Sequence, residues 1–349
     1  MIHTIVLEDL EFVLSHDVDW ERLAGKTVLV TGANGFLPAY MVETILRINE
    51  KSLAEKTRVL ALVRNASRAE KRFSMYQGRK DFALVIQDVC EELRIDEPID
   101  FIIHGASQAS PKYFGSDPIG TLSANVLGTH NTLVLAERNK IESFLFFSSG
   151  EVCGKLRPDQ MPMSEDIYGP LDPTDIRVCY AESKRMGELM CSSWRHQRGI
   201  PTKVVRPFHT YGPGMLLDDG RVFADFVSCI LQSRDLVMHS EGTHTRAFCY
   251  LADATAAYFK VLLDGDPGMA YNVGNDAAEI SIRDLAEMLV KIFPEKGLKV
   301  VCRPESKPSG YLRHDQPRNC PDLTRIRSLG WAPSTSLEAG FRRTVASYL

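Results

Sequence analysis

The sequence predicts an α/β protein that is built on a doubly wound parallel sheet and carries a smaller C-terminal lobe. Short apolar, β-branched runs alternate with helical stretches over residues 25–207, which is typical of buried parallel strands joined by helices. Beyond about residue 208 this alternation loosens, and loops and prolines become frequent. We therefore expect a helical extension over 1–24, a sheet domain over 25–207, and a lobe over 208–349 from which some segments return to the sheet.

Composition limits the partners of the chain. It has 349 residues, 44% hydrophobic and 25% charged, with a net charge of −4, which argues against nucleic acid or an anionic membrane as the main partner. No signal peptide opens it and no apolar run reaches about 18 residues, so we expect a cytoplasmic protein. The eight cysteines form no CxxC pair and the histidines no HExxH motif, so we expect free thiols and no metal.

The first strand and the turn after it form the clearest local motif. Residues 1–24 carry an amphipathic pattern that predicts a short helix on the domain surface. Residues 26–31 (KTVLVT) then predict a buried strand, followed by a glycine turn and a helix over 36–48. This order is typical of a Rossmann-type dinucleotide site, because glycines let the backbone approach a pyrophosphate at the helix N-terminus. The predicted cofactor contacts here are Gly32, Asn34, Gly35, Phe36 and Leu37.

Two residues near this turn depart from the usual pattern. Pro38 occupies the place of a third glycine, but a first helical turn accepts proline, so we expect cofactor binding to be retained. Arg64 ends the second strand, residues 58–63, where an acid commonly binds the adenosine ribose. An arginine there suits a 2′-phosphate and so NADP, with Arg68 as a helper. Alternatively, Arg64 stacks on adenine or lies in solvent, and NAD is bound.

The later strands end in small and polar residues. Strand 82–86 precedes Asp88 and Val89, and strand 99–104 runs into Gly105, Ala106 and Ser107. A helix over 118–139, which contains Asn125, leads to strand 143–147, and this strand ends at Ser148, Ser149, Gly150 and Glu151. Ligands of open α/β sheets bind at the carboxyl ends of the strands, so we expect the chemistry to take place at these residues.

A tyrosine and a lysine four residues apart form a candidate proton-transfer pair. Tyr180 and Lys184 lie in YAESK, on a helix predicted over 173–198, and would share one helix face. An ammonium group beside a phenol favours the phenolate and so makes the tyrosine a better base. A strand over 202–206 follows, and the lobe after it carries basic residues at Arg221, Arg246, Arg313 and Arg318.

Five motifs together resemble the extended short-chain dehydrogenases/reductases that act on nucleotide sugars: TGANGF, HGAS, SSGE, YAESK and RPFHTYGPG. The resemblance covers about residues 25–345. The branch most similar in GASQASPKYFGSDPIGTLSANVLGT, CYAESKRMGE, TYGPGMLLDDGRVFADFV and TRAFCY is that of the UDP-glucuronate decarboxylases, or UDP-xylose synthases. It implies NAD as cofactor and a triad: Tyr180 takes the sugar 4-hydroxyl proton, Lys184 holds the nicotinamide ribose and lowers the tyrosine pKa, and Ser149 binds the same sugar oxygen.

The resemblance leaves three fates for the 4-keto sugar. The 4,6-dehydratases of the family use an adjacent Asp-Glu pair, and here Gly150 occupies the Asp position. The decarboxylases have a Glu and an Arg at the positions of Glu151 and Arg246, and both are present. Simple 4-epimerisation requires only room for the keto sugar to turn over. Alternatively, Glu151 caps a loop and Arg246 binds the substrate diphosphate. Products of such enzymes serve cell-surface polysaccharide synthesis.

The resemblance also implies a wider set of contacts and a homodimer. Expected cofactor contacts are Arg64, Asp88, Val89, Gly105, Ala106, Ser107, Asn125, Ser148, Tyr180, Lys184, Pro207 and His209; expected substrate contacts are Ser110, Ser149, Gly150, Glu151, Tyr180, His209, Arg221, Val222, Arg246 and Arg318. His209 replaces the usual asparagine and Cys153 a common tyrosine. The helices of Asn125 and Tyr180 form the family's dimer surface. The rival hypothesis is a non-catalytic dinucleotide-binding protein, which would not need Ser149, Tyr180 and Lys184 together.

Overall fold

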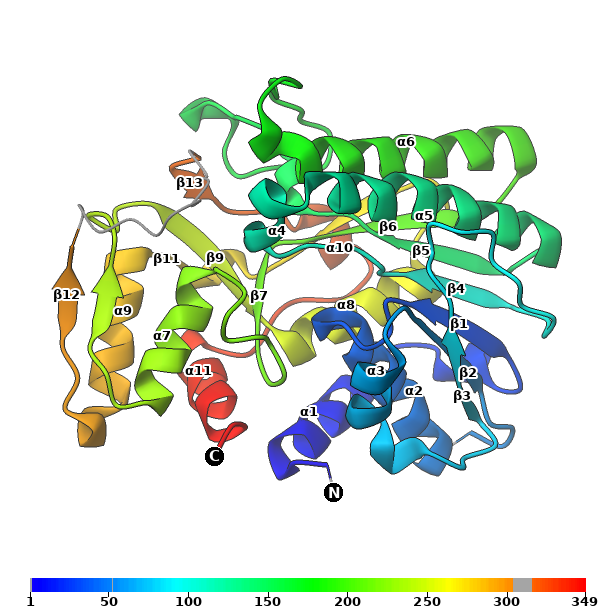
Figure 1. Ribbon diagram of the computed structural model, residues 1–349, viewed down its shortest axis with the longest axis horizontal. Helices are drawn as coiled ribbons and strands as arrows, with labels where there is room; N and C mark the ends of the chain where they lie inside the picture. Colours follow the sequence, from blue (N-terminus) through cyan, green and yellow to red (C-terminus); the bar gives the residue numbers. More distant parts are fainter. Residues whose placement is uncertain (1, 52, 304–315) are drawn as a thin grey trace.

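The computed structural model describes residues 2–51, 53–303 and 316–349, so the predicted lobe residue Arg313 lies outside the described residues. A seven-stranded sheet forms the centre of the molecule, between two layers of helices, and the smaller lobe lies beside it (Figure 1). The strand order is β10-β6-β5-β4-β1-β2-β3, and every neighbouring pair is parallel. The predicted doubly wound parallel sheet is therefore confirmed.

The strands form close to where the sequence predicts them. Their bounds are Thr27–Thr31 (β1), Arg58–Val63 (β2), Phe82–Ile86 (β3), Phe101–His104 (β4), Ser143–Phe147 (β5), Thr202–Pro207 (β6) and Ala270–Val273 (β10). The chain winds from β1 through β2 to β3 and then returns to β4 on the other side of β1. The carboxyl ends of β1 and β4 therefore flank the point where the winding direction reverses, which is where ligands bind in such sheets.

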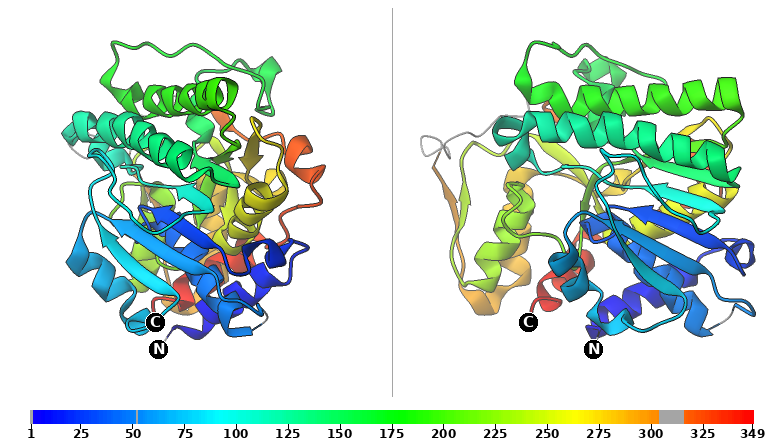
Figure 2. Two further views of the ribbon diagram at one scale, coloured as in Figure 1. Left: turned by 90° about the vertical axis from the view of Figure 1, so that its right-hand side faces the viewer. Right: turned by 45° about the vertical axis from the view of Figure 1, so that its right-hand side comes forward.

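Alternating side chains of the strands fill two separate cores. On one face, Val28 and Val30 pack with α2 (Phe36–Lys51) and α8 (Leu251–Asp264). On the other face, Leu29 and Phe144 pack with α5 (Pro118–Asn139) and α6 (Cys179–Arg198). The two helical layers on opposite sides of the sheet are visible in Figure 2. This alternation follows from the two-residue side-chain period of a strand.

The N-terminal helix α1 (Thr4–Leu14) is fixed by one buried carboxylate. Asp9 accepts hydrogen bonds from the hydroxyls of Tyr40 (3.1 Å) and Tyr250 (2.8 Å) and from the guanidinium of Arg343 (2.7 Å). Burial raises the Asp9 pKa, although these three donors oppose the shift. The extension is thereby joined to α2, to the start of α8 and to the C-terminal helix α11 (Leu337–Ala346).

The smaller lobe contains two short sheets and their helices. One sheet comprises β7 (His209–Tyr211), β9 (Thr245–Tyr250), β11 (Glu279–Ser281) and β13 (Arg318–Asn319), and the other β8 (Leu236–Met238) and β12 (Val300–Cys302). The helices α7 (Val222–Leu231) and α9 (Ile282–Ile292) lie in this lobe; α3 (Ala66–Arg72), α4 (Pro111–Ser116) and α10 (Thr324–Arg327) are short helices elsewhere. Some segments return from the lobe to the sheet domain: β10 is a strand of the central sheet, and α8 belongs to the helical layer on one of its faces.

Three observations bear on the composition. All eight cysteines are free thiols, as expected. Over residues 2–51, 53–303 and 316–349, no helix combines the length and the apolar character needed to cross a bilayer. Over the same residues, no group of three His, Cys, Asp or Glu side chains gathers in a way that would hold a metal ion.

Candidate active site

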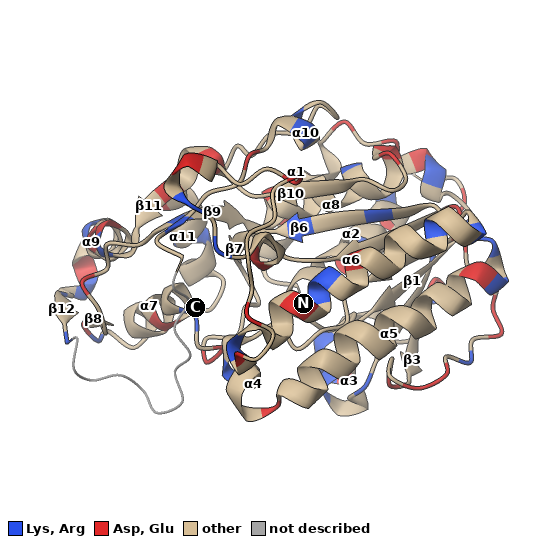
Figure 3. Cartoon of the chain, turned by 90° about the horizontal axis from the view of Figure 1, so that it is seen from above, with Lys and Arg blue, Asp and Glu red and all other residues tan. Residues whose placement is uncertain are grey.

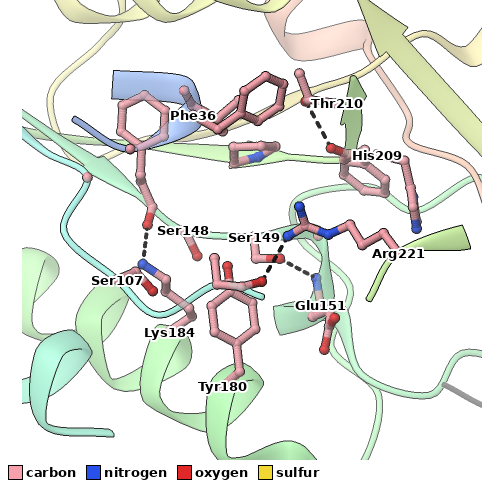
Figure 4. A pocket seen from close by; sticks show the side chains of 18 of the residues that line it. Phe36, Ser107, Ser148, Ser149, Glu151, Tyr180, Lys184, His209, Thr210 and Arg221 are labelled. Carbon is pink, nitrogen blue, oxygen red and sulfur yellow. Dashed lines mark hydrogen bonds between the residues drawn. The ribbon is translucent and has the colours of Figure 1, made fainter. Parts of the chain in front are cut away.

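A cavity opens at the carboxyl ends of β1, β4, β5 and β6, where the lobe faces the sheet (Figure 4). Most of the residues predicted from the sequence to bind cofactor or substrate meet there. Those that line the cavity are Gly35, Phe36, Leu37, Gly105, Ser107, Ser148, Ser149, Gly150, Glu151, Tyr180, Lys184, Pro207, His209 and Arg221. They come from segments far apart in the sequence, so the topology of the sheet brings them together.

The glycine turn after β1 requires its glycine and tolerates its proline. Gly32 has φ +64°, and a Cβ there would lie 2.7 Å from the Ala106 Cα, so a side chain does not fit. A Cβ on Gly105 would lie 2.5 Å from Cγ of Pro38, whose ring therefore fills the gap between the helix and β4. Pro38 is the third residue of α2, where an N–H has no partner within the helix, so the proline breaks no helical bond.

A chain of buried hydrogen bonds links the residues next to this turn to β4 and α5. The ring of His104, the last residue of β4, contacts the Thr31 hydroxyl through Nδ1 (2.7 Å) and the Thr129 hydroxyl through Nε2 (3.1 Å). Thr129 donates to the Asn125 carbonyl, and the Ala106 N–H donates to the Thr31 hydroxyl. Burial and, to a smaller extent, the Lys184 charge lower the His104 pKa to about 3, so the ring is neutral.

Tyr180 and Lys184 lie on one buried face of α6, at 7% and 2% exposure. Lys184 Nζ donates to the Phe147 carbonyl (2.6 Å) and lies 5.8 Å from the centre of the Tyr180 ring. Burial raises the Tyr180 pKa to about 12; the Glu151 charge adds to the shift, while a hydrogen bond with Ser149 and the charges of Arg221 and Arg177 oppose it. Burial lowers the pKa of Lys184 itself to about 7.

The loop after β5 places Ser149 and Glu151 beside the tyrosine. The Ser149 hydroxyl accepts the Glu151 N–H (3.2 Å) and so caps the short turn Gly150–Cys153. A Cβ on Gly150 would lie 2.9 Å from the Phe208 ring, which also lines the cavity. The position that carries Asp in dehydratases is therefore filled from the lobe side by an aromatic ring.

The carboxylate of Glu151 is held by an arginine that the sequence analysis missed. Arg177 Nη1 lies 3.0 Å from Oε2, and Nη2 lies 3.3 Å from Oε1. The Arg177 guanidinium also lies 5.0 Å from the centre of the Phe114 ring, which stacks on Tyr180 at 5.0 Å and 15°. Its position three residues before Tyr180, on the segment that leads into the helix, is the sequence signal that could have identified it.

Two other predicted residues, Asn125 and Ser148, form hydrogen bonds that hold α6 in place. Asn125 is fully buried and donates to Ser183 Oγ (2.9 Å), and Ser183 donates to the Tyr180 carbonyl (2.9 Å). Ser148 donates to Glu188 (2.5 Å), whose carboxylate also accepts two bonds from the fully buried Arg206. These contacts fix α6 against its neighbours.

Several predicted residues lie outside the cavity lining that the described residues form: Gly32, Asn34, Arg64, Asp88, Val89, Ala106, Ser110, Asn125, Val222, Arg246 and Arg318. Arg64 is 69% exposed, 3.8 Å from the Asp88 carboxylate. Ser110 donates to the Asp219 carbonyl, and Val222 starts α7. Val89 packs against Gly128, where a Cβ would lie 2.8 Å from its side chain.

Neither lobe arginine at the small sheet lines the cavity among the described residues. Arg246 is buried and donates to the carbonyls of Thr245 (2.7 Å) and Pro317 (3.4 Å). Arg318 forms two hydrogen bonds of 2.8 Å with Glu279, so its neighbour Asn319 faces the cavity instead. Successive residues of a strand point to opposite sides, which explains why only one of Arg318 and Asn319 can face the cavity. His209 lines the cavity, with its ring 5.7 Å from Phe248.

Sequence comparisons relate the chain to known proteins. The family model described as NAD dependent epimerase/dehydratase matches residues 28–274. UDP-glucuronic acid decarboxylase 6 of Arabidopsis thaliana is 33% identical over 316 residues, which cover 90% of this chain and 86% of the plant protein. UDP-glucuronic acid decarboxylase 1 of Xenopus tropicalis is 32% identical over 322 residues, which cover 92% of this chain and 71% of the frog protein.

Solved structures share the fold. UDP-glucose 4-epimerase from Thermotoga maritima superposes with a TM-score of 0.77 at 21% identity, over 92% of this chain and 98% of that one. UDP-glucuronic acid 4-epimerase from Bacillus cereus, in complex with UDP-glucuronic acid and NAD, gives 0.76 at 23% identity over the same shares. At these identities the likeness concerns the fold alone.

Proposed function

The chain belongs to the NAD dependent epimerase/dehydratase family, and on this premise we propose that it oxidises C4 of UDP-glucuronate and then releases C6 as carbon dioxide. The observation that carries the choice of reaction concerns the carboxylates of the cavity. Among the described residues that line it, Glu151 is the single acid and is paired with Arg177, while Phe208 closes the space beside Gly150. The sequence relatives named UDP-glucuronic acid decarboxylases support the same substrate.

The residues of the cavity fit a dinucleotide. Gly32 allows close backbone approach, the first residues of α2, Phe36 and Leu37, line the cavity, and Ser107 Oγ is buried without a hydrogen-bond partner among the described residues. When bound, NAD accepts a hydride from the sugar C4 and returns it at the end of the cycle. Arg64 ends β2 exposed, so its guanidinium is accessible to an adenosine ribose, with or without a phosphate.

Three side chains provide the proton transfer at C4. Tyr180, as the phenolate, takes the proton of the 4-hydroxyl as the hydride leaves, and Ser149 binds the same oxygen. Because burial raises the Tyr180 pKa to about 12, this base requires positive charge nearby, and Lys184 is the closest cation on its own helix. Asn125 and Ser183 hold the helix turn that carries the phenol.

The second step needs little chemistry from the protein. The C4 ketone makes the uronate a β-keto acid, so its C5–C6 bond breaks with the electron pair moving into the C4 enolate as carbon dioxide leaves. C5 then takes a solvent proton, for which Glu151 is the proposed relay. Return of the hydride to C4, with the Tyr180 proton, completes a UDP-pentose.

Dehydration is the less suited alternative for this cavity. It needs an acid beside a base to expel the C6 hydroxyl, and the ring of Phe208 lies where a side chain at position 150 would begin. Epimerisation shares the first step with decarboxylation, and its product has a different mass, so one assay separates the two.

The same proposal extends to a homodimer in the cytoplasm. Exposed apolar residues cluster on the outer sides of α5 and α6: Ile119, Leu122, Leu127, Met186 and Leu189. In Figure 3, where the cartoon is coloured by residue type, the charged residues of α5 lie only toward its end. A face of this kind suits burial against a second copy of itself. The eight free thiols suit a reducing compartment.

Product analysis tests the proposal. The purified protein is incubated with UDP-glucuronate, UDP-glucose and UDP-galactose. The nucleotide sugars are separated by chromatography, which resolves isomers of equal mass, and are then identified by mass, together with the dinucleotide that co-purifies. We expect a UDP-pentose and carbon dioxide in equal amounts from UDP-glucuronate, and neither from Tyr180→Phe with its dinucleotide still bound. Conversion of the neutral sugars alone, without carbon dioxide from UDP-glucuronate, would overturn the proposal.

A further inference from the structure

We propose that Arg177 is a positioning residue for the step after C4 oxidation, and that it holds the Glu151 carboxylate toward the C5–C6 end of the sugar. The inference rests on the proposed function and assigns its second step to a unit of four side chains: Arg177, Glu151, Phe114 and Tyr180. Arg177 acts through Glu151 and does not itself line the cavity that the described residues form.

The contact between Arg177 and Glu151 involves two guanidinium nitrogens and both carboxylate oxygens. The two terminal nitrogens of Arg177 reach the two carboxylate oxygens of Glu151 at 3.0 and 3.3 Å. The side chains are 12% and 24% exposed, so water competes weakly for them. A bidentate pair of this kind fixes the rotation of the carboxylate as well as its position, because turning it would break one of the two bonds.

Aromatic stacking fixes the plane of the guanidinium. Its carbon lies 5.0 Å from the centre of the Phe114 ring, and Phe114 stacks on Tyr180 with 5.0 Å between ring centres and 15° between planes. Arg177 Nε is buried and has no hydrogen-bond partner among the described residues. The orientation of Arg177 therefore follows from Glu151 on one side and Phe114 on the other.

This arrangement couples the two catalytic groups. Glu151 and Tyr180 both line the cavity, and the Glu151 charge contributes to the raised Tyr180 pKa. Removing Arg177 would take away the two bonds that fix the rotation of the carboxylate. The oxidation step depends on Tyr180, Lys184 and Ser149 and would retain its own contacts.

The structure shows an arginine from outside the predicted motifs at both oxygens of Glu151: Arg177 bonds to each of them. Arg246, which the resemblance sets at the position of the decarboxylases' arginine, donates to the backbone carbonyls of Thr245 and Pro317. The positioning role is therefore assigned to Arg177 from bonds observed in the fold.

Single-turnover measurements on the holoenzyme test the inference. The variants are Arg177→Met, Arg177→Lys and Arg177→Ala. Arg157→Met is the control, because Arg157 forms an exposed ion pair with Asp159 in the loop before α6. Two rates are followed with UDP-glucuronate that is labelled at C6. One is the rise in absorbance of reduced nicotinamide, and the other is the release of labelled carbon dioxide. Thermal unfolding and bound dinucleotide content show that each variant is folded.

For Arg177→Met we expect nicotinamide reduction within about threefold of wild type and carbon dioxide release slower by about 100-fold, the loss typical of a misplaced catalytic group. Reduced dinucleotide should therefore accumulate. Arg177→Lys should release carbon dioxide at a rate between those of wild type and Arg177→Met, because lysine keeps the charge but not the planar fork of the guanidinium. Added guanidinium ion should partly restore carbon dioxide release in Arg177→Ala.

Two results would overturn the inference while leaving the proposed function intact: equal losses in both rates, or no loss in the release of carbon dioxide. Failure of guanidinium to restore release in Arg177→Ala, with the protein folded, would also contradict it. If wild type itself releases no carbon dioxide, the proposed function fails, and the inference that rests on it fails with it.

Discussion

Replacing Lys184 by methionine should change how the stability of the protein depends on pH. Lys184 is 2% exposed, and its ammonium donates to the Phe147 carbonyl at 2.6 Å and lies 4.9 Å from the Phe146 ring centre. Burial lowers its pKa from 10.5 to about 7, although the charges of Cys191 and Glu188 oppose the shift. The folded chain therefore releases this proton near neutral pH, whereas the unfolded chain keeps it until about pH 10.

The sign and the size of the effect follow from this difference in proton binding. Between these two pKa values the unfolded state binds more protons than the folded state, so the free energy of unfolding rises with pH. Each pH unit contributes about 1.4 kcal/mol, which amounts to about 4 kcal/mol between about pH 7 and pH 10. Below about pH 7 both states bind the proton, and the full cost of burying the charge remains.

Urea unfolding of the dinucleotide-free proteins at both pH values measures this contribution. The difference in unfolding free energy, wild type minus Lys184→Met, should increase by about 4 kcal/mol over that range. Lys291→Met, at an exposed position on α9, serves as the control and should show no such increase. A wild-type minus Lys184→Met difference that stays constant within about 1 kcal/mol would refute the argument that Lys184 carries a buried, easily lost proton.

Three further substitutions test other parts of the structure. Gly150→Asp should lower the free energy of unfolding by about 1–3 kcal/mol through overlap with Phe208, and adding Phe208→Ala should recover part of this; no recovery would contradict the overlap. Arg206→Met should cost about 3–5 kcal/mol in a denaturant titration, because it leaves the Glu188 carboxylate without its buried partner, and a loss below about 1 kcal/mol would count against the pair. Leu189→Glu should convert the proposed dimer to a monomer in light scattering, and an unchanged mass would argue against the α5–α6 surface.

Local signals explain which elements the sequence could predict. The long helix α5 has the predicted bounds, because Pro118 stands in its first turn and Asp117 accepts the Gly120 N–H as its cap. The start of α6 was predicted at 173 but lies at Cys179. Asp172 and Asp175 each accept an N–H two residues on, so the chain forms turns before it becomes helical.

The site was predictable only where its chemistry lies in one short motif. Spacing singled out Tyr180 and Lys184, and position after a strand singled out Ser149 and Glu151, but the roles of all four came from the family resemblance. Arg177 was missed because its partner lies far from it in the sequence. The choice of which neighbour in a short strand faces the cavity, as for Arg318 and Asn319, depends on register in a sheet assembled from distant segments. The raised Tyr180 pKa depends on burial, which the spacing does not show.

The most direct test of the proposed reaction is a single turnover with UDP-glucuronate labelled at C6. Reduced nicotinamide absorbance and labelled carbon dioxide are recorded together on wild-type protein. The mechanism predicts that the absorbance rises first and decays as carbon dioxide and a UDP-pentose appear in equal amounts. A transient rise followed by return of a UDP-hexuronate, with the label retained, would contradict decarboxylation and indicate an epimerase.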